Sequence, residues 1–260
     1  MRIRLLALAV GFMAFTLFTT SPAFAQNGMH GEFSVLFWQP DPELTLQSGA
    51  ITGATGIQNV DFVQTFGIES KGFPEIRARL GRNHKFRFSF VPVKYEASAT
   101  ITRAITFQGR TFNIGVPAST EIKWNLMHVG YEWDFVSMEK GYVGVIGELK
   151  YQKLDASITS PALSGPAATD QKAPVPTIGL GFRGYPVPMV GIGGEFGGLK
   201  ISSSDFEAKL FDFDINGFVQ FGQYIGVQGG YRAVTIDYTI DNDTGDLKLK
   251  GPYVGAILRF

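Results

Sequence analysis

The side chains of this sequence that could do chemistry are few. Its 260 residues include three histidines, His30, His84 and His128, and no cysteine. The lack of thiols excludes disulfides, thiolate metal sites, a cysteine nucleophile and a lipidated N-terminal cysteine. His128 comes nearest to a catalytic set, because Glu132 and Asp134 follow it on the same face of an alternating segment. No serine stands beside it on that segment, and no acidic pair can be placed at an open rim, so we predict no catalytic site.

Two glycine-containing motifs fail the tests for a bound cofactor or metal. Residues 179–184, GLGFRG, match the G-x-G-x-x-G of dinucleotide sites, but that motif must join a strand to a helix, and Pro186 and Pro188 follow at once. Small residues facing a crowded interior explain the motif better. Residues 241–246, DNDTGD, resemble a calcium loop, yet glycine is fifth instead of sixth and position twelve is Pro252. We predict a polar turn there, with weak divalent binding as the alternative, and no cofactor.

The elements that position these residues are strands, because apolar and polar residues alternate from residue 29 to the end. Residues 57–67 are the exception and could form a short helix or an extra strand. Residues 100–117 could form a β-ribbon in a loop, either an exposed surface for adhesion or a partner or a plain loop hairpin. We therefore predict an all-β chain of about ten strands, with eight or twelve as alternatives: 31–38, 72–80, 84–100, 120–136, 141–156, 174–185, 188–200, 206–222, 224–240 and 247–260.

The connections between these strands are sorted. Tight turns at 81–83, 137–140, 186–187 and 222–223 alternate with longer or more polar connections at 39–71, 101–119, 157–173, 201–205 and 241–246. An antiparallel up-and-down transmembrane β-barrel has this arrangement, with short turns on one side and long loops on the other. Several strands exceed the roughly 9–11 residues that cross a bilayer, so the sheet should project beyond the outer surface.

The first residues predict export. Arg2 and Arg4 precede an apolar run over 5–18, and Ala23 and Ala25 supply the small residues of a cleavage site before Gln26. A transmembrane helix is the alternative, but the run is short for one. We divide the chain into a cleaved signal peptide, 1–25, and a single barrel domain, 26–260. The 23 basic and 23 acidic residues give no basic excess, so we predict no nucleic-acid partner.

The two faces of the strands differ in chemistry. One face is aromatic and aliphatic and should meet lipid, while the other is ionic and should face the lumen. Ten strands lie close to the size that side chains just fill, so we predict an ion-pair network that plugs most of the lumen, with a narrow pore as the alternative. Its predicted members are Glu32, Arg77, Arg79, Arg87, Glu132, Asp134, Glu148, Lys150, Arg183, Glu195, Asp212, Asp214, Arg232 and Arg259.

The chain closes on GPYVGAILRF, in which Val254, Ala256, Leu258 and Phe260 alternate with smaller or polar residues. With the export signal and the strand periodicity, this ending resembles the bacterial outer-membrane β-barrel superfamily over residues 29–260. In that family such a strand looks like the signal read by the barrel-assembly machinery. The resemblance implies a monomeric barrel in a Gram-negative outer membrane, in contact with its lipids and lipopolysaccharide. It names no activity, and the active-site patterns of the known barrel proteases and phospholipases are absent.

Three functions stay open on the sequence. We expect a non-enzymatic surface barrel for envelope integrity, adhesion or binding. The alternatives are a narrow channel for ions or small solutes and an enzyme that modifies lipid or lipopolysaccharide.

Overall fold

The structure, a computed structural model, describes residues 30–47, 58–202, 206–240 and 243–260. Ten antiparallel strands form one closed barrel, because the first strand pairs with the last. This confirms the predicted fold and strand number. The predicted signal peptide lies outside the described residues. The barrel strands are β1 (Gly31–Trp38), β4 (Phe73–Gly81), β5 (His84–Thr100), β8 (Pro117–Met138), β9 (Gly141–Thr159), β10 (Ala167–Val187), β11 (Val190–Ser202), β12 (Phe206–Phe221), β13 (Ile225–Ile240) and β14 (Asp243–Arg259).

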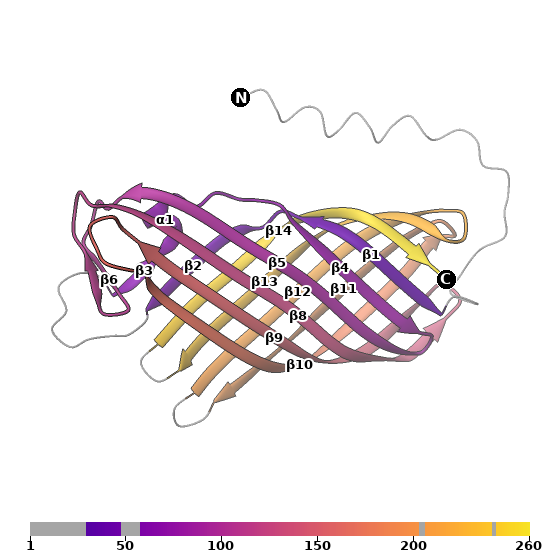
Figure 1. Cartoon of the computed structure of the whole chain (residues 1–260). Coiled ribbons are helices and arrows are strands. Elements are labelled where there is room, and N and C mark those ends of the chain that lie inside the picture. Colours follow the sequence, from indigo (N-terminus) through magenta and orange to yellow (C-terminus); the bar gives the residue numbers. More distant parts are fainter. Residues whose placement is uncertain (1–29, 48–57, 203–205, 241–242) are drawn as a thin grey trace.

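Short elements gather at one end of the barrel (Figure 1). β2 (Asp41–Gln47) continues along β14 in the register that β1 began, and β3 (Asn59–Asp61) pairs with β2. α1 (Phe62–Phe66) follows directly, so the stretch expected to be helix or strand contains both. β6 (Ile105–Phe107) and β7 (Arg110–Phe112) form the small hairpin predicted within 100–117. No helix among the described residues is long and apolar enough to cross a membrane.

Local chemistry explains why α1 is so short. The Asp61 carboxylate accepts a hydrogen bond from the Gln64 backbone N–H at 2.9 Å, which caps the first turn. Gly67 then takes a left-handed φ of 66° and its N–H donates to the Val63 carbonyl. Glycine tolerates this conformation, and it ends the helix after Phe66. The turn buries Phe62 and Phe66 at the mouth of the barrel.

The sorting of connections by length holds only in part. The turns at 82–83, 139–140, 188–189 and 222–224 are tight, as predicted, and the first three connections at the opposite end are long. The last two connections there, predicted to be longer or more polar, cover only 203–205 and 241–242, which lie outside the described residues; they are therefore not longer than the tight turns. The strands simply continue: Ser202 pairs with Glu207, and Ile240 with Asp243. The DNDTGD stretch is therefore mostly strand.

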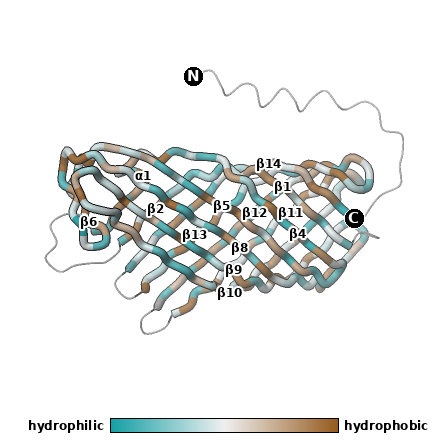
Figure 2. The backbone as a smooth tube through the Cα atoms, in the orientation of Figure 1, coloured by the Kyte–Doolittle hydropathy of each residue, from teal (hydrophilic) through white to brown (hydrophobic). Residues whose placement is uncertain are grey.

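The barrel has two halves with opposite chemistry. We call the end that holds the start of β1 the basal half, namely residues 31–38, 73–90, 127–151, 174–199, 211–233 and 252–259. The remaining described residues form the distal half. Along both halves, hydrophilic and hydrophobic residues alternate (Figure 2), but the phase of the alternation changes where the halves meet.

Strand β5 shows this change of phase. In the basal half Phe86 and Phe88 point outward, with 71% and 37% of their surface exposed, while Lys85 points into the barrel and is buried. In the distal half Val91 and Tyr95 are buried inside, and the charged side chains are outside. The basal half is thus arranged for an apolar exterior, and the distal half follows the rule of a water-soluble protein.

Candidate functional site

The basal bore holds a buried network of ion pairs. The structure places all fourteen residues predicted for the lumen in ion pairs, and it adds Glu75 and Lys85, which were not among them. The described network has eight carboxylates and eight cations, so the bore is electrically balanced. The carboxylates are Glu32, Glu75, Glu132, Asp134, Glu148, Glu195, Asp212 and Asp214; the cations are Arg77, Arg79, Lys85, Arg87, Lys150, Arg183, Arg232 and Arg259.

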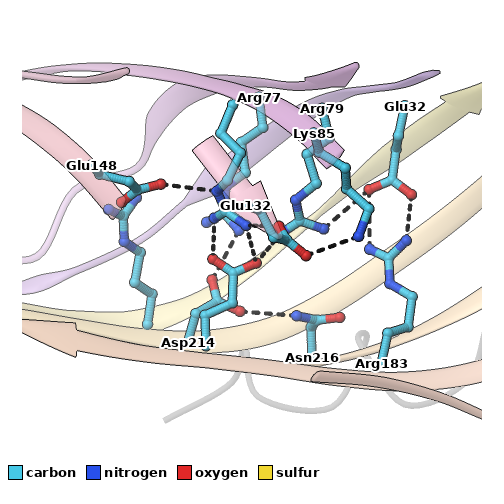
Figure 3. Close-up of polar contacts among 12 residues, drawn as sticks. Glu32, Arg77, Arg79, Lys85, Glu132, Glu148, Arg183, Asp214 and Asn216 are labelled. Carbon is cyan, nitrogen blue, oxygen red and sulfur yellow. Dashed lines mark hydrogen bonds and ion pairs between the residues drawn. The ribbon is translucent and has the colours of Figure 1, made fainter. Parts of the chain in front are cut away.

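The pairs cross the bore and join strands that are distant in sequence (Figure 3). Arg87 contacts Glu132, Glu148 and Glu195, which come from three other strands. Nearer the distal half, Glu75 is fully buried between two guanidiniums. It lies 2.6 Å from Arg77 Nε and 2.8 Å from Arg232 Nη1. Such bidentate, charge-assisted contacts satisfy buried charges that would otherwise be very costly.

The distal bore is filled by apolar side chains instead. Trp124, Leu126 and Phe62 are at most 1% exposed and belong to one continuous hydrophobic cluster, which Trp38 joins from the end of the basal half. The β6–β7 hairpin adds Phe107 and Phe112, and the Phe107 ring meets Phe62 edge-on at 5.4 Å. This hairpin turns its apolar face onto the cluster, so that face is not an exposed partner surface, while Gly109, Asn113 and Ile114 lie exposed.

A small cavity lies within the ionic filling. It measures about 60 Å³, and His128, Lys150, Asp212 and Ser89 line it. Ser89 stands directly opposite His128 on the neighbouring strand, a cross-strand pair that could not be read from one strand alone. No hydrogen bond joins the two among the described contacts, and the buried His128 Nε2 has no protein partner. Lys150 faces His128 on its other side. The cavity has room for water rather than for an acyl substrate.

Known structures allow this geometry to be compared. The outer membrane protease OmpT from Escherichia coli matches 89% of this chain and 97% of its own length, with a TM-score of 0.51 and 8% sequence identity. The chain has the outer-membrane β-barrel fold. At 8% identity the similarity to OmpT is one of fold alone, and it says nothing about activity.

Other solved outer-membrane barrels align less well. Ail, the attachment invasion locus protein of Yersinia pestis, gives a TM-score of 0.40 at 12% identity over 89% of this chain and 100% of its own. The translocator domain of the autotransporter NalP from Neisseria meningitidis gives 0.41 at 12% identity over 90% of each chain. No protein-family model matches the sequence. No curated protein matches it either.

The exterior of the distal half of the barrel carries paired charges. Sixteen of the described charged groups on this exterior contact a group of opposite sign. The pairs include Lys94 with Glu96, Lys123 with Glu121, Lys153 with Asp155, Lys172 with Asp170, Lys200 with Glu207, Lys209 with Asp237, and Lys248 and Lys250 with Glu43, and Asp246 pairs with Lys248. Lysines and carboxylates at this level suit water or lipid head groups and exclude the hydrocarbon layer.

One exterior group gives a pH-dependent prediction. A hydrogen bond from Lys123, and then one from Lys94, lower the pKa of Glu121 from 4.5 to about 2. Because the folded-state value is the lower one, the stabilisation is complete above pH 4.5 and is lost as the pH falls toward 2. Glu121→Gln should flatten this acid dependence by losing the same small amount of stability at pH 7, since exposed pairs contribute little. Urea unfolding at pH 7 and pH 3 measures both; an unaltered difference between the two pH values would contradict the assignment.

Proposed function

We propose that this protein is a sealed, non-enzymatic outer-membrane barrel that acts through the surface it raises beyond the bilayer, in a structural or surface-binding role in the envelope. The observation that carries the proposal is the double closure of the bore. An ionic filling in the basal half and an apolar filling in the distal half stand in series. An ion would have to break the first and a polar solute would have to cross the second, so a channel is the weaker reading.

The proposal includes a location and contacts. The outward aromatic residues of the basal half fit outer-membrane lipid, and the paired charges of the distal exterior fit the lipopolysaccharide head groups above it. Export through the leader at residues 1–25 would deliver a single, monomeric barrel domain to a Gram-negative outer membrane. The closed ring of ten strands supports a monomer, because it leaves no ladder edge for a second copy in lipid.

Single-channel recording tests the sealed bore. The purified protein should give no discrete conductance steps in a planar bilayer at protein loads where a general porin, tested in the same bilayer, gives many. Vesicles that contain it should likewise not swell in small sugars. Discrete steps at a low load would overturn the proposal in favour of a pore. An altered phospholipid or lipid A profile in cells that overproduce the protein would overturn its non-enzymatic part.

Phe260 should be needed for assembly. Its carbonyl accepts hydrogen bonds from the His30 and Gly31 N–H groups at 2.7 and 2.8 Å, and its ring lies against the Gly31 backbone. Deleting it removes both bonds and the ring, so we expect much less folded barrel in the membrane fraction. Phe260→Leu keeps the backbone bonds and an apolar side chain, and it serves as the matched control. Normal levels of the deletion variant would show that the seam closes without Phe260.

A further inference from the structure

The basal mouth of the bore has an excess of positive charge. A cavity of about 60 Å³ opens there, next to the β4–β5 turn. This volume suits a few waters or one small anion. One carboxylate lines the cavity, that of Glu32, whereas five cationic side chains do: Arg79, Arg82, Lys85, Arg183 and Arg259. Lys85 is already paired with Glu132 and Asp134, so the excess comes from the arginines.

Glu32 is shared by three guanidiniums. Arg183 binds it with both Nη atoms, at 2.6 and 3.0 Å, Arg259 Nε lies at 3.0 Å, and Arg79 Nη1 at 3.3 Å. Arg79 has a second carboxylate in Glu195. Within the described contacts Arg183 and Arg259 have no carboxylate other than Glu32, so two buried positive charges share one negative charge.

Arg259 adds an independent sign of an incomplete site. Its Nη2 is buried and has no hydrogen-bond partner, and the side chain is only 6% exposed, so bulk water does not reach it. The Gln220 amide oxygen accepts from Nη1 at 3.1 Å in the orientation that satisfies both groups. A buried guanidinium N–H without an acceptor is unfavourable, so an oxygen supplied by a ligand would stabilise it.

The two guanidiniums are held in place by an aromatic ring. The centre of the Phe218 ring lies 4.9 Å from the guanidinium carbon of Arg183 and 4.7 Å from that of Arg259. The ring can lie there because Gly191 has no side chain; a Cβ at that position would fall 1.9 Å from the ring. Cation–π contact offsets part of the charge and fixes both groups, but it offers no oxygen acceptor.

We propose that this basal mouth binds a small tetrahedral oxyanion of the phosphate class. Arg259 holds it through the unpartnered Nη2, and Arg183 through the N–H donors that Glu32 leaves free, since guanidinium donors match phosphate oxygens. Arg82 lies exposed in the turn at the same cavity and attracts the anion from the basal side. The site shares Glu32, Arg183 and Arg259 with the ionic filling. It lies at the basal mouth, so binding there does not depend on whether the barrel conducts.

Phosphate titration of the whole protein tests the site. In a detergent with an uncharged sugar head group and a phosphate-free buffer, calorimetry with inorganic phosphate should show saturable binding of one anion per barrel, and acetate should bind more weakly. Arg259→Gln should weaken binding about tenfold or more, which is the effect of one lost charge-assisted hydrogen bond. Arg82→Gln should weaken it less, since that charge is solvated. Lys248→Gln, on the distal exterior, is the control and should bind as the natural chain does.

A third variant separates a binding site from a structural role. Glu32→Gln removes the competing carboxylate, so it should tighten phosphate binding even though it weakens the folded barrel. A purely structural cluster predicts no gain. The proposal is overturned if the natural chain shows no saturable phosphate binding. It is also overturned if Arg82→Gln, which should fold because Arg82 is exposed, binds phosphate as tightly as the control.

The source of the anion can be separated in the same assay. In bilayer discs of phosphatidylglycerol, unchanged phosphate affinity indicates free phosphate as the ligand. If phosphate binding is lost in these discs but is restored in discs of phosphate-free lipid, a lipid phosphate occupies the mouth.

Discussion

Glu75→Gln should destabilise the barrel by about 3–5 kcal/mol, the usual cost of removing one partner from a buried ion pair. The Glu75 carboxylate is fully buried and contacts both Arg77 and Arg232. Without its charge, two guanidiniums stay in the bore with only Asp212 and Asp214 to balance them. This loss of folding stability should hardly change with salt concentration, because ions from solution do not reach the site.

The matched control is Glu96→Gln. Glu96 is paired with Lys94 at 2.7 Å, but its side chain is 57% exposed on the distal exterior. An exposed pair contributes about 1 kcal/mol or less, and salt screens it. Urea unfolding from lipid vesicles at low and high salt measures both variants. Equal losses in the two would mean that the ionic filling contributes no more than a surface pair.

Trp38→Ala should have the second large effect, because Trp38 stands where the ionic and apolar fillings meet. Its side chain is completely buried, its Nε1 donates to the Gly251 carbonyl at 3.1 Å, and the Arg232 guanidinium carbon lies 5.3 Å from its ring centre. Truncation leaves a cavity and an unpaired carbonyl lone pair, and removing a buried tryptophan typically costs about 3–5 kcal/mol. Water from the ionic side could enter the space, so brief low-conductance openings should appear.

Phe37→Ala is the control for this prediction. Phe37 is the preceding residue of the same strand, but it points outward and is 54% exposed. Its loss removes contact with the surrounding medium and opens no cavity in the bore. We expect a smaller loss of stability in vesicle unfolding and a bilayer trace as silent as that of the natural chain. Conductance openings in Phe37→Ala, or no openings in a folded Trp38→Ala, would contradict the prediction that Trp38 seals the bore.

Much of the fold could be predicted from the sequence because a strand has a period of two. Alternation, turn residues and the closing apolar strand require only local reading, and they led to ten antiparallel strands and a closed barrel. The polar face of the basal segments could be predicted in the same way. Strand ends could not, because β8 and β10 begin at Pro117 and Ala167, before the apolar pattern becomes clear.

The partners within the bore could not be predicted, since they depend on the closed geometry. Arg183 and Glu32 are 151 residues apart, and Arg232 and Glu75 are 157 apart. Only the curvature of the sheet brings these pairs together. Lys85 was missed because it lies one residue after the start of β5, beside a turn, where a lysine usually faces water. Ser89 was missed as the neighbour of His128 because register between strands is not written in either strand alone.

The change of phase between the halves did leave a sequence signal. Two adjacent apolar residues interrupt the alternation at Phe90–Val91, Leu126–Met127 and Leu210–Phe211. In each pair one residue points outward in the basal half and the other points inward in the distal half. Such a doublet is what a strand needs when the medium outside it changes from apolar to aqueous.

The belt of paired charges on the distal exterior also fixes how deep the molecule can sit. Pushing the barrel inward by a few residues would carry lysines such as Lys94, Lys123 and Lys153 toward the hydrocarbon, at about 2–4 kcal/mol each at the midplane. Pulling it outward would expose the basal aromatics to water. Displacing the barrel along the membrane normal is therefore unfavourable in both directions. A force that pushes it inward should meet a single abrupt yield point rather than a gradual slide, because charges on several strands must desolvate together.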